Sequence, residues 1–333
     1  MDAPGEPARP EHDPSTGLGG PPPAAPLRPE IALFRALSDD RAGQFAGLLS
    51  RVLTGEDPEA VHDLRVWSRR MQQILDALYS DIRPRRIRSL RRRLRRIRRR
   101  LGGWRDCDIA LEFVRRKRRS TRSGPKRHAW ELVAEQSTNK RTDEILRARR
   151  WLLRGAVARV PAELQEALKE ARRGAWEQKL PIGIRERGAE AAERWRSALQ
   201  VATTSSDLAS VHAFRVATKR LRYRLELDRE SGRPPLKGVL SWLRQLQASL
   251  GQWHDRQTFY RLTAVVLARA EILLEEPEAV RIVLGDLEKE RGRDAPALAE
   301  VFSLANAKAP LSALEAWTAG TQGIDVAQSF TRS

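Results

Sequence analysis

VHDLRVWSRR at residues 61–70 and VHAFRVATKR at residues 211–220 are two versions of one pattern, 150 positions apart. A second pair of motifs follows in the same order, with LGGWRD at 101–106 and LGQWHD at 250–255, at an offset of 149. Self-similarity at a fixed offset is the signature of a repeated structural unit. Agreement of residue type, order and spacing across both pairs therefore indicates a duplicated unit.

Apolar residues around these motifs recur at steps of three and four, which is the period of a helix that buries one face. The apolar stripe of each first motif comprises Val61, Leu64, Ser68, Met71, Leu75 and Leu78, or Val211, Phe214, Thr218, Leu221 and Leu225. The segment before each second motif repeats as well, with Ile87, Leu90, Leu94, Ile97 and Leu101 matching Leu236, Val239, Leu243, Leu246 and Leu250. We therefore predict an all-α fold of two pseudo-symmetric helical bundles from an internal duplication.

The chain divides by composition into four parts. Residues 1–29 are rich in Pro and Gly and predict a disordered tail, because such a segment buries too little apolar surface to order itself. Residues 30–179 form the first predicted half and residues 180–320 the second, with a helix boundary expected at Pro181-Ile182-Gly183. Residues 321–333 lose the helical period and predict a frayed end.

The charge of the chain points to a polyanionic partner. Lys and Arg outnumber Asp and Glu by 62 to 43, which gives a formal charge of +19. Residues 83–100 alone contain twelve Arg in eighteen positions. Cys107 is the sole cysteine, which excludes an internal disulfide and a cysteine zinc site, and no motif for a cofactor occurs. With neither a long apolar run nor a signal-like N-terminus, the sequence predicts a cytoplasmic protein without a membrane span.

The motif helices carry a basic face beside the apolar stripe. Steps of three and four place His62, Arg65 and Arg69 on one face, and the second copy repeats this with His212, Arg215, Lys219 and Arg222. Like charges at this spacing repel one another and destabilise the helix unless an anion is present. Because both copies of the motif carry this cost in stability, we predict that the basic face binds an anion. In the segments before the second motifs, Arg88 and Arg95 align with Lys237 and Arg244 at offset 149. We predict that these basic pairs contribute to the same site.

With these motifs assembled, the sequence resembles the CHAD family, the conserved histidine α-helical domain, over about residues 30–320. The resemblance implies two helical bundles that bind inorganic polyphosphate without catalysis and localise to polyphosphate granules. Residue by residue, it extends the predicted site to His62, Arg65, Arg69, Arg70, His212, Arg215, Lys219, Arg220 and Arg222. The first copy departs from the pattern at Gln72 and Gln73, where the second has Arg222 and Tyr223, which predicts unequal contributions from the two halves.

Two other classes of function stay open as alternatives, and the oligomeric state is open as well. A helix dense in Arg would also bind nucleic acid. Against this alternative, no nucleic-acid motif occurs, and Trp104 and Trp253 repeat at equivalent positions, as residues that anchor a core do. An enzyme acting on phosphate polymers would need acid–base or metal groups, for which only the two motif His and Asp106 and Asp255 stand out. Helix capping by these Asp or their pairing with Arg is the simpler interpretation. Binding to an anionic membrane surface ranks last.

Overall fold

A computed structural model describes residues 28–55, 57–79, 84–173, 176–233, 236 and 238–329, with side chains described as far as residue 319. Residues 1–27 of the expected tail, Lys237 of the predicted site and the side chains of the expected C-terminal tail lie outside this description. Within it, the chain is helical throughout and contains no strand, so the all-α prediction is confirmed. The backbone remains helical to Ser329, beyond the point at which the sequence predicted fraying.

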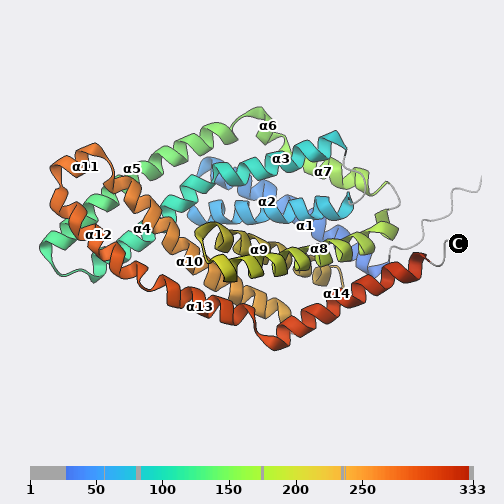
Figure 1. The fold of residues 1–333 in the computed structure, drawn as a ribbon. Coiled ribbons are helices and arrows are strands. Elements are labelled where there is room, and N and C mark those ends of the chain that lie inside the picture. Colours follow the sequence, from blue (N-terminus) through green and yellow to red (C-terminus); the bar gives the residue numbers. More distant parts are fainter. Residues whose placement is uncertain are drawn as a thin grey trace, which may run out of the picture.

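The helices follow one another through short connections, and Figure 1 shows them gathered into one elongated body. Their bounds are α1 Pro29–Thr54, α2 Pro58–Leu78, α3 Arg85–Arg100, α4 Gly102–Ser120, α5 Gly124–Leu152, α6 Gly155–Ala158, α7 Val160–Ala171, α8 Trp176–Ser205, α9 Leu208–Glu230, α10 Val239–Leu267, α11 Ala270–Glu275, α12 Pro277–Arg291, α13 Asp294–Ala305 and α14 Lys308–Ser329. Among the described residues, none of these helices is both long and apolar enough to cross a bilayer.

The two motif helices, α2 and α9, begin in the same way. The carboxylate of Asp57 accepts a hydrogen bond from the backbone N–H of Glu59 at 2.9 Å, and Pro58 occupies the first turn of α2. Asp207 caps α9 by accepting from the N–H groups of Ala209 and Ser210, both at 2.8 Å. Such caps satisfy amides that a helix start leaves without partners. The predicted apolar stripes then point into the interior, where every member is buried except Leu78.

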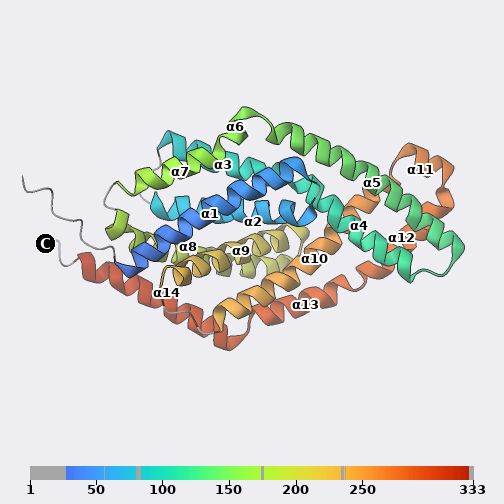
Figure 2. The same cartoon turned by 180° about the vertical axis from the view of Figure 1, so that it is seen from behind.

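The buried apolar side chains form three clusters. One joins α1, α2, α3 and α7, and a second joins α8, α9, α10 and α13. The second lies within the predicted second half, whereas the first combines most of the predicted first half with Leu180, Ile184 and Leu227. The third cluster was not predicted, and it draws on both parts of the chain: α4 and α5 supply Cys107 and Trp130, while α10 and α12 supply Phe259 and Leu287. Figure 2 shows these four helices extending together from one end of the molecule.

The predicted helix boundary at Pro181-Ile182-Gly183 is wrong, because α8 runs through it without a break. Proline lacks the N–H that would bond to the carbonyl oxygen of Glu177, one turn earlier. That oxygen instead accepts a hydrogen bond from the Arg28 guanidinium at 2.5 Å. The carbonyl of Pro181 itself accepts one from Arg233 at 2.6 Å. The Arg28 side chain thus replaces the bond that proline removes, and Arg233 adds a further contact to the same turn.

The two LGxW motifs differ in the backbone they adopt. In the first, a single residue, Leu101, separates α3 from α4, which begins at the Gly102-Gly103 pair. In the second, the chain passes through Gly251 inside the continuous helix α10. Two successive glycines weaken a helix more than one does, because each adds backbone freedom that folding must remove. The Gly102-Gly103 pair therefore marks the junction of α3 and α4, whereas Gly251 does not interrupt α10.

Candidate functional site

The basic faces of α2 and α9 meet between the two bundles, and α3 adds a further arginine. We call Arg65, Arg69, Arg98, Arg215 and Lys219 the central cluster. Arg69 lies within electrostatic range of Arg98, Arg215 and Lys219, so the cluster combines the two motifs and the Arg-rich helix. Arg69 is also held over the ring of Tyr223 in α9, with its guanidinium carbon 5.9 Å from the ring centroid.

The cations of the central cluster have no anionic partner within ion-pair distance among the described residues. Buried nitrogen atoms of Arg65, Arg98 and Arg215 lack any hydrogen-bond partner there. Burial, with Arg215, Arg69 and Arg65 nearby, lowers the pKa of Lys219 to about 6. Burial and the neighbouring arginines likewise lower the pKa of Arg98 to about 9. Partly desolvated basic groups held together without counter-charges form a site that favours an anion.

The carboxylates nearest to the cluster come from the LGxWxD motifs. Asp106 raises the pKa of Arg65 against the opposing effect of burial, and Asp255 does the same for Arg215. Asp106 is also ion-paired with Arg261 of α10 at 3.0 Å. The sequence-based interpretation of these Asp as partners of Arg thus agrees with their surroundings. Across the described residues, no group of three or more His, Cys, Asp and Glu side chains is arranged to hold a metal ion.

The two motif histidines lie beside basic residues at corresponding positions. Burial of part of the ring and the nearby Arg105 lower the pKa of His62. Burial and the neighbouring His254, whose ring centroid is 5.6 Å away, lower the pKa of His212. Arg105 and His254 occupy the same place in LGGWRD and LGQWHD. Both shifts in pKa favour the uncharged ring in the free protein, and an incoming anion would favour protonation.

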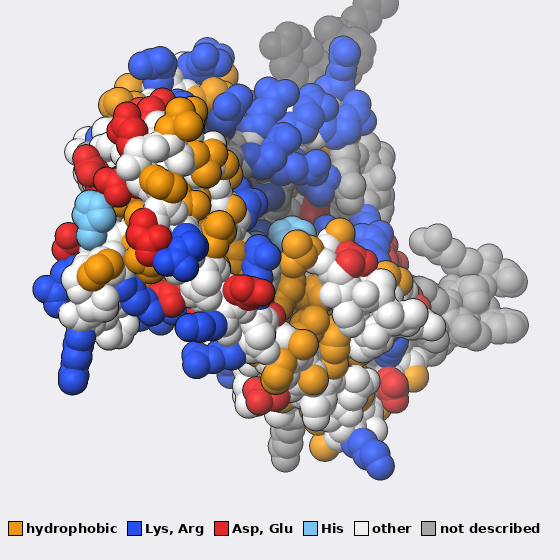
Figure 3. All heavy atoms as spheres, turned by 60° about the vertical axis from the view of Figure 1, so that its left-hand side comes forward, with side chains coloured by type: hydrophobic (Ala, Val, Ile, Leu, Met, Phe, Trp, Pro, Cys, Tyr) orange, Lys and Arg blue, Asp and Glu red, His pale blue; other side chains and the backbone are white. Residues whose placement is uncertain are grey.

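One side of the α2–α9 contact opens into a cavity of about 530 Å³, which we call the cationic cavity. Helices α2, α3, α8 and α9 each supply part of its wall. The lining carries eight arginines and two carboxylates: Arg69, Arg91, Arg95, Arg98, Arg187, Arg194, Arg220 and Arg224 against Asp76 and Glu190. Figure 3 shows Lys and Arg side chains densely gathered beside the hollow between two lobes of the molecule. The cavity therefore presents a concave, strongly positive surface.

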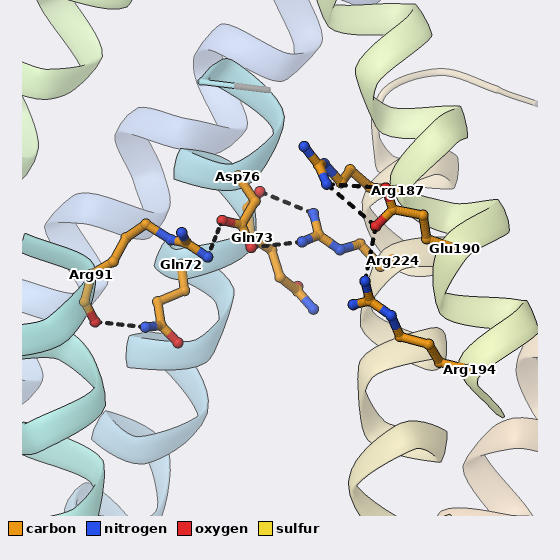
Figure 4. Close-up of polar contacts among 8 residues, drawn as sticks. All are labelled: Gln72, Gln73, Asp76, Arg91, Arg187, Glu190, Arg194 and Arg224. Atoms are coloured by element: carbon orange, nitrogen blue, oxygen red, sulfur yellow. Dashed lines mark hydrogen bonds and ion pairs between the residues drawn. The ribbon is translucent and has the colours of Figure 1, made fainter. Parts of the chain in front are cut away.

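The two carboxylates of the cationic cavity hold its arginines in position, as Figure 4 shows. Asp76 of α2 is ion-paired with Arg91 of α3 at 2.5 Å and with Arg224 of α9 at 2.7 Å. Glu190 of α8 is ion-paired with Arg187 at 3.1 Å and with Arg194 at 3.5 Å. These fixed pairs orient planar guanidinium groups towards a shared space, an arrangement suited to bidentate contacts with phosphate oxygens.

The comparisons with known proteins agree with this geometry. A model of the CHAD domain family matches residues 36–264, which is more than two thirds of the chain. The protein belongs to the CHAD family. Among solved structures, it is similar to the crystal structure of the CHAD domain from the plant Ricinus communis, with a TM-score of 0.62 and 22% identity. That match covers 88% of this chain and 93% of the other, and it shows a shared CHAD fold. The comparison with curated proteins finds no match.

The opposite side of the α2–α9 contact in this CHAD domain is closed by ion pairs. Arg222 is paired with Glu226 at 3.6 Å and lies over the ring of Tyr223 at 4.5 Å. Arg41 is paired with Glu230, and Arg70 lies near enough to lower the pKa of Arg41. Carboxylates therefore neutralise much of the positive charge on this side. Of the predicted residues, Arg70 and Arg222 lie on this more neutral side.

Eight of the thirteen predicted residues converge on the site, and four described ones, Arg70 and Arg222 among them, do not. Arg65, Arg69, Arg215 and Lys219 lie in the central cluster, His62 and His212 lie beside it, and Arg95 and Arg220 line the cationic cavity. Arg88 and Arg244 are exposed on α3 and α10 and do not line the cavity. Lys237 lies outside the described residues.

The sequence reasoning missed five cations of the cavity, namely Arg91, Arg98, Arg187, Arg194 and Arg224. The internal alignment gave no support to Arg91 and Arg98, because they align with the uncharged residues Leu240 and Gln247 of the second copy. Helical spacing carried a usable signal, since Arg91, Arg95 and Arg98 recur at steps of four and three. In this protein, the shared helix face of these arginines predicted the cavity lining better than conservation of charge between the two sequence copies did.

Proposed function

We propose that this CHAD protein binds inorganic polyphosphate without catalysis, through the central cluster and the cationic cavity beside it. Membership of the CHAD family supports a polyphosphate-related role. The feature that carries the proposal is the cluster itself, in which Arg65, Arg69 and Lys219 face one another without a paired carboxylate. Such a cluster is stabilised by a ligand that brings several negative charges on a narrow chain.

A titration across salt concentrations tests the proposal. We expect long-chain polyphosphate to bind with an affinity that falls steeply as salt rises, because binding releases counterions from the polyanion. The double variant Arg69→Gln/Arg215→Gln should flatten that slope by roughly one unit for each phosphate that the variant no longer neutralises. A matched control, Arg281→Gln/Arg291→Gln, removes two exposed cations of α12 and should leave the slope unchanged. Equal slopes in the site variant and the parent would exclude these residues from the site.

Nucleic acid is the principal alternative ligand. Trp104 and Trp253, the aromatic residues of the LGxW motifs, are buried at 0% and 5% exposure, which leaves them no surface on which a base could stack. The cavity lining contains no aromatic side chain either. We therefore expect polyphosphate to displace duplex DNA at equal charge concentration. Displacement of polyphosphate by the duplex would overturn the assignment of the ligand.

Catalysis on phosphate polymers is the second alternative. Hydrolysis or phosphoryl transfer requires a positioned nucleophile, base or metal ion. The candidate acid Asp106 is engaged with Arg261. Lys219 lies near both motif histidines, with Arg105 beside His62 and Arg215 beside His212. We expect purified protein to leave the length of polyphosphate chains unchanged. Chain shortening that disappears in His62→Ala would contradict the proposal.

We further propose that the protein acts in the cytoplasm and associates with polyphosphate granules. The proposal follows from the ligand, because a protein that binds the polymer partitions to the places where the polymer accumulates. A fluorescent fusion should co-localise with stained polyphosphate, and the Arg69→Gln/Arg215→Gln variant should spread evenly. Identical distributions of the two proteins would contradict association through this site.

A further inference from the structure

The Arg-rich helix α3 presents four different faces to its surroundings. Ile87, Leu90, Leu94 and Ile97 are buried in the first core. On the next face, Arg91, Arg95 and Arg98 line the cationic cavity. On the side towards α7, Arg93 donates to Glu163 at 2.7 Å and Arg86 is ion-paired with Glu170. The remaining face, opposite the apolar one, carries Arg85, Arg92, Arg96 and Arg99, which we call the outer stripe.

The outer stripe is exposed along its whole length. From Arg85 to Arg99 it extends over about 21 Å, at the helical rise of 1.5 Å per residue. No carboxylate of the described chain lies within ion-pair distance of its four members. Like charges at steps of three, four and seven repel one another and weaken the helix that carries them. A row of this kind is therefore most stable when a polyanion lies along it.

The second half of the chain lacks an equivalent of the outer stripe. At offset 149, Arg85, Arg92, Arg96 and Arg99 align with Pro234, Ser241, Gln245 and Ala248. The central cluster, in contrast, draws on both motifs. The stripe is thus a feature of one helix, added to a site that both halves share.

The outer stripe adjoins the cationic cavity. Arg95 is exposed to solvent and also lines the cavity, and on the helix surface it lies between Arg91 on the cavity side and Arg92 on the outer side. A chain that leaves the cavity past Arg95 therefore reaches the stripe without crossing neutral surface. Because the apolar residues of α3 are buried and its sequence contains no aromatic residue, the stripe offers nothing to insert into a membrane or to stack on a base.

We propose that the outer stripe is a second contact surface for polyphosphate, which a chain reaches only when it is long enough to continue out of the cationic cavity. This inference rests on the proposed function, since it assigns the stripe to the same ligand. It makes binding dependent on chain length: short chains contact the cavity alone, whereas long chains also contact Arg85, Arg92, Arg96 and Arg99.

Two probes and two variants test the inference. The probes are tripolyphosphate, which spans the cavity at most, and long-chain polyphosphate. The stripe variant is Arg85→Gln/Arg92→Gln/Arg96→Gln/Arg99→Gln, and glutamine keeps the helix propensity of these positions. The matched control, Arg281→Gln/Lys289→Gln/Arg291→Gln/Arg293→Gln, removes the same charge from exposed positions of α12 and the turn after it. Circular dichroism and thermal unfolding verify that both variants fold.

We expect the stripe variant to bind tripolyphosphate as the control does and to bind long chains roughly 10- to 1000-fold more weakly at moderate salt, with a flatter salt slope. Equal losses for both probes, or no loss for either, would overturn the inference while leaving the proposed function standing. Failure of the parent protein to bind either probe would instead remove the proposed function.

Discussion

Asp76 of α2 accepts a hydrogen bond from Arg224 of α9 at 2.7 Å, across the contact between the two motif helices. The same carboxylate is ion-paired with Arg91 of α3. One acidic side chain thus connects three helices and neutralises part of the wall of the cationic cavity. This internal counter-charge reduces the repulsion among the cavity arginines and so stabilises the fold in the absence of ligand.

Replacing this counter-charge should have opposite effects on stability and on binding. In Asp76→Asn, Arg91 and Arg224 lose their carboxylate partner, so we expect the free energy of unfolding to fall by on the order of 3 kcal/mol. Affinity for polyphosphate should rise, because two guanidinium groups become available and one repelling charge is gone. Denaturant unfolding with and without polymer measures both effects. The control Glu190→Gln removes two more exposed ion pairs and should cost less than about 1 kcal/mol. Weaker polymer binding by Asp76→Asn would contradict this account.

Lys219 should limit the stability of the free protein. Its lowered pKa of about 6 means that the folded state disfavours the charged ammonium, whereas an unfolded chain keeps it charged at neutral pH. We expect Lys219→Met to raise the free energy of unfolding at pH 7 by on the order of 1 kcal/mol while weakening polyphosphate binding. The gain should shrink as pH rises towards 10, where the unfolded lysine also loses its proton. Destabilisation by this substitution at pH 7 would argue for a structural role of the lysine.

Binding should be linked to proton uptake. Burial and neighbouring cations lower the pKa values of Lys219, His62 and His212, so these bases are largely neutral in the free protein above pH 7. A polyanion raises those pKa values, and the affinity for long chains should therefore fall as pH increases from 6 to 8. Calorimetry in buffers of different ionisation enthalpy counts the protons taken up. The count should drop in Lys219→Met, and an unchanged count would remove Lys219 from the linkage.

The packing of α14 depends on a glycine in α8. A Cβ atom at Gly188 would lie 2.5 Å from Cη2 of Trp317, so the indole ring would have to move. We expect Gly188→Ala to lower the free energy of unfolding by about 1–3 kcal/mol and to leave polyphosphate affinity unchanged. Gly47→Ala in α1 is the matched control, because a Cβ there meets nothing within 4 Å. It should stabilise the helix by about 0.5–1 kcal/mol, and similar effects of the two substitutions would contradict the packing argument.

Helical periodicity predicted the elements that carry the site. The buried stripes of α2 and α9 and the caps at Asp57 and Asp207 depend on local sequence, and the basic faces follow because they adjoin those stripes. The convergence of Arg69 with Arg98 could not be predicted in this way, because it depends on how α2 and α3 are packed. The difference between Gln72 and Arg222 predicted that the two halves contribute unequally to binding. No sequence pattern predicted that Glu226 and Glu230 would neutralise the side of the α2–α9 contact opposite the cationic cavity.

The continuity of α8 could not be predicted from the sequence for a different reason. Proline predicts a boundary from local rules, but the oxygen that Pro181 leaves unbonded is satisfied by Arg28, 149 positions away in the chain. Tertiary hydrogen bonds of this kind override local propensity. The same holds for the third core, since Trp130 and Phe259 come together only after α5 and α10 have been placed.

That third core bears on the origin of the chain. Trp130 belongs to the first half of the sequence and Phe259 to the second, and each buries apolar surface that its own half would leave exposed to water. We therefore expect that neither half folds autonomously and that a fragment ending near residue 179 aggregates or pairs with a copy of itself. If the two halves descend from one ancestor, we infer that the ancestor formed a homodimer through this apolar contact. Duplication and fusion of its gene would then have joined the two subunits in one chain.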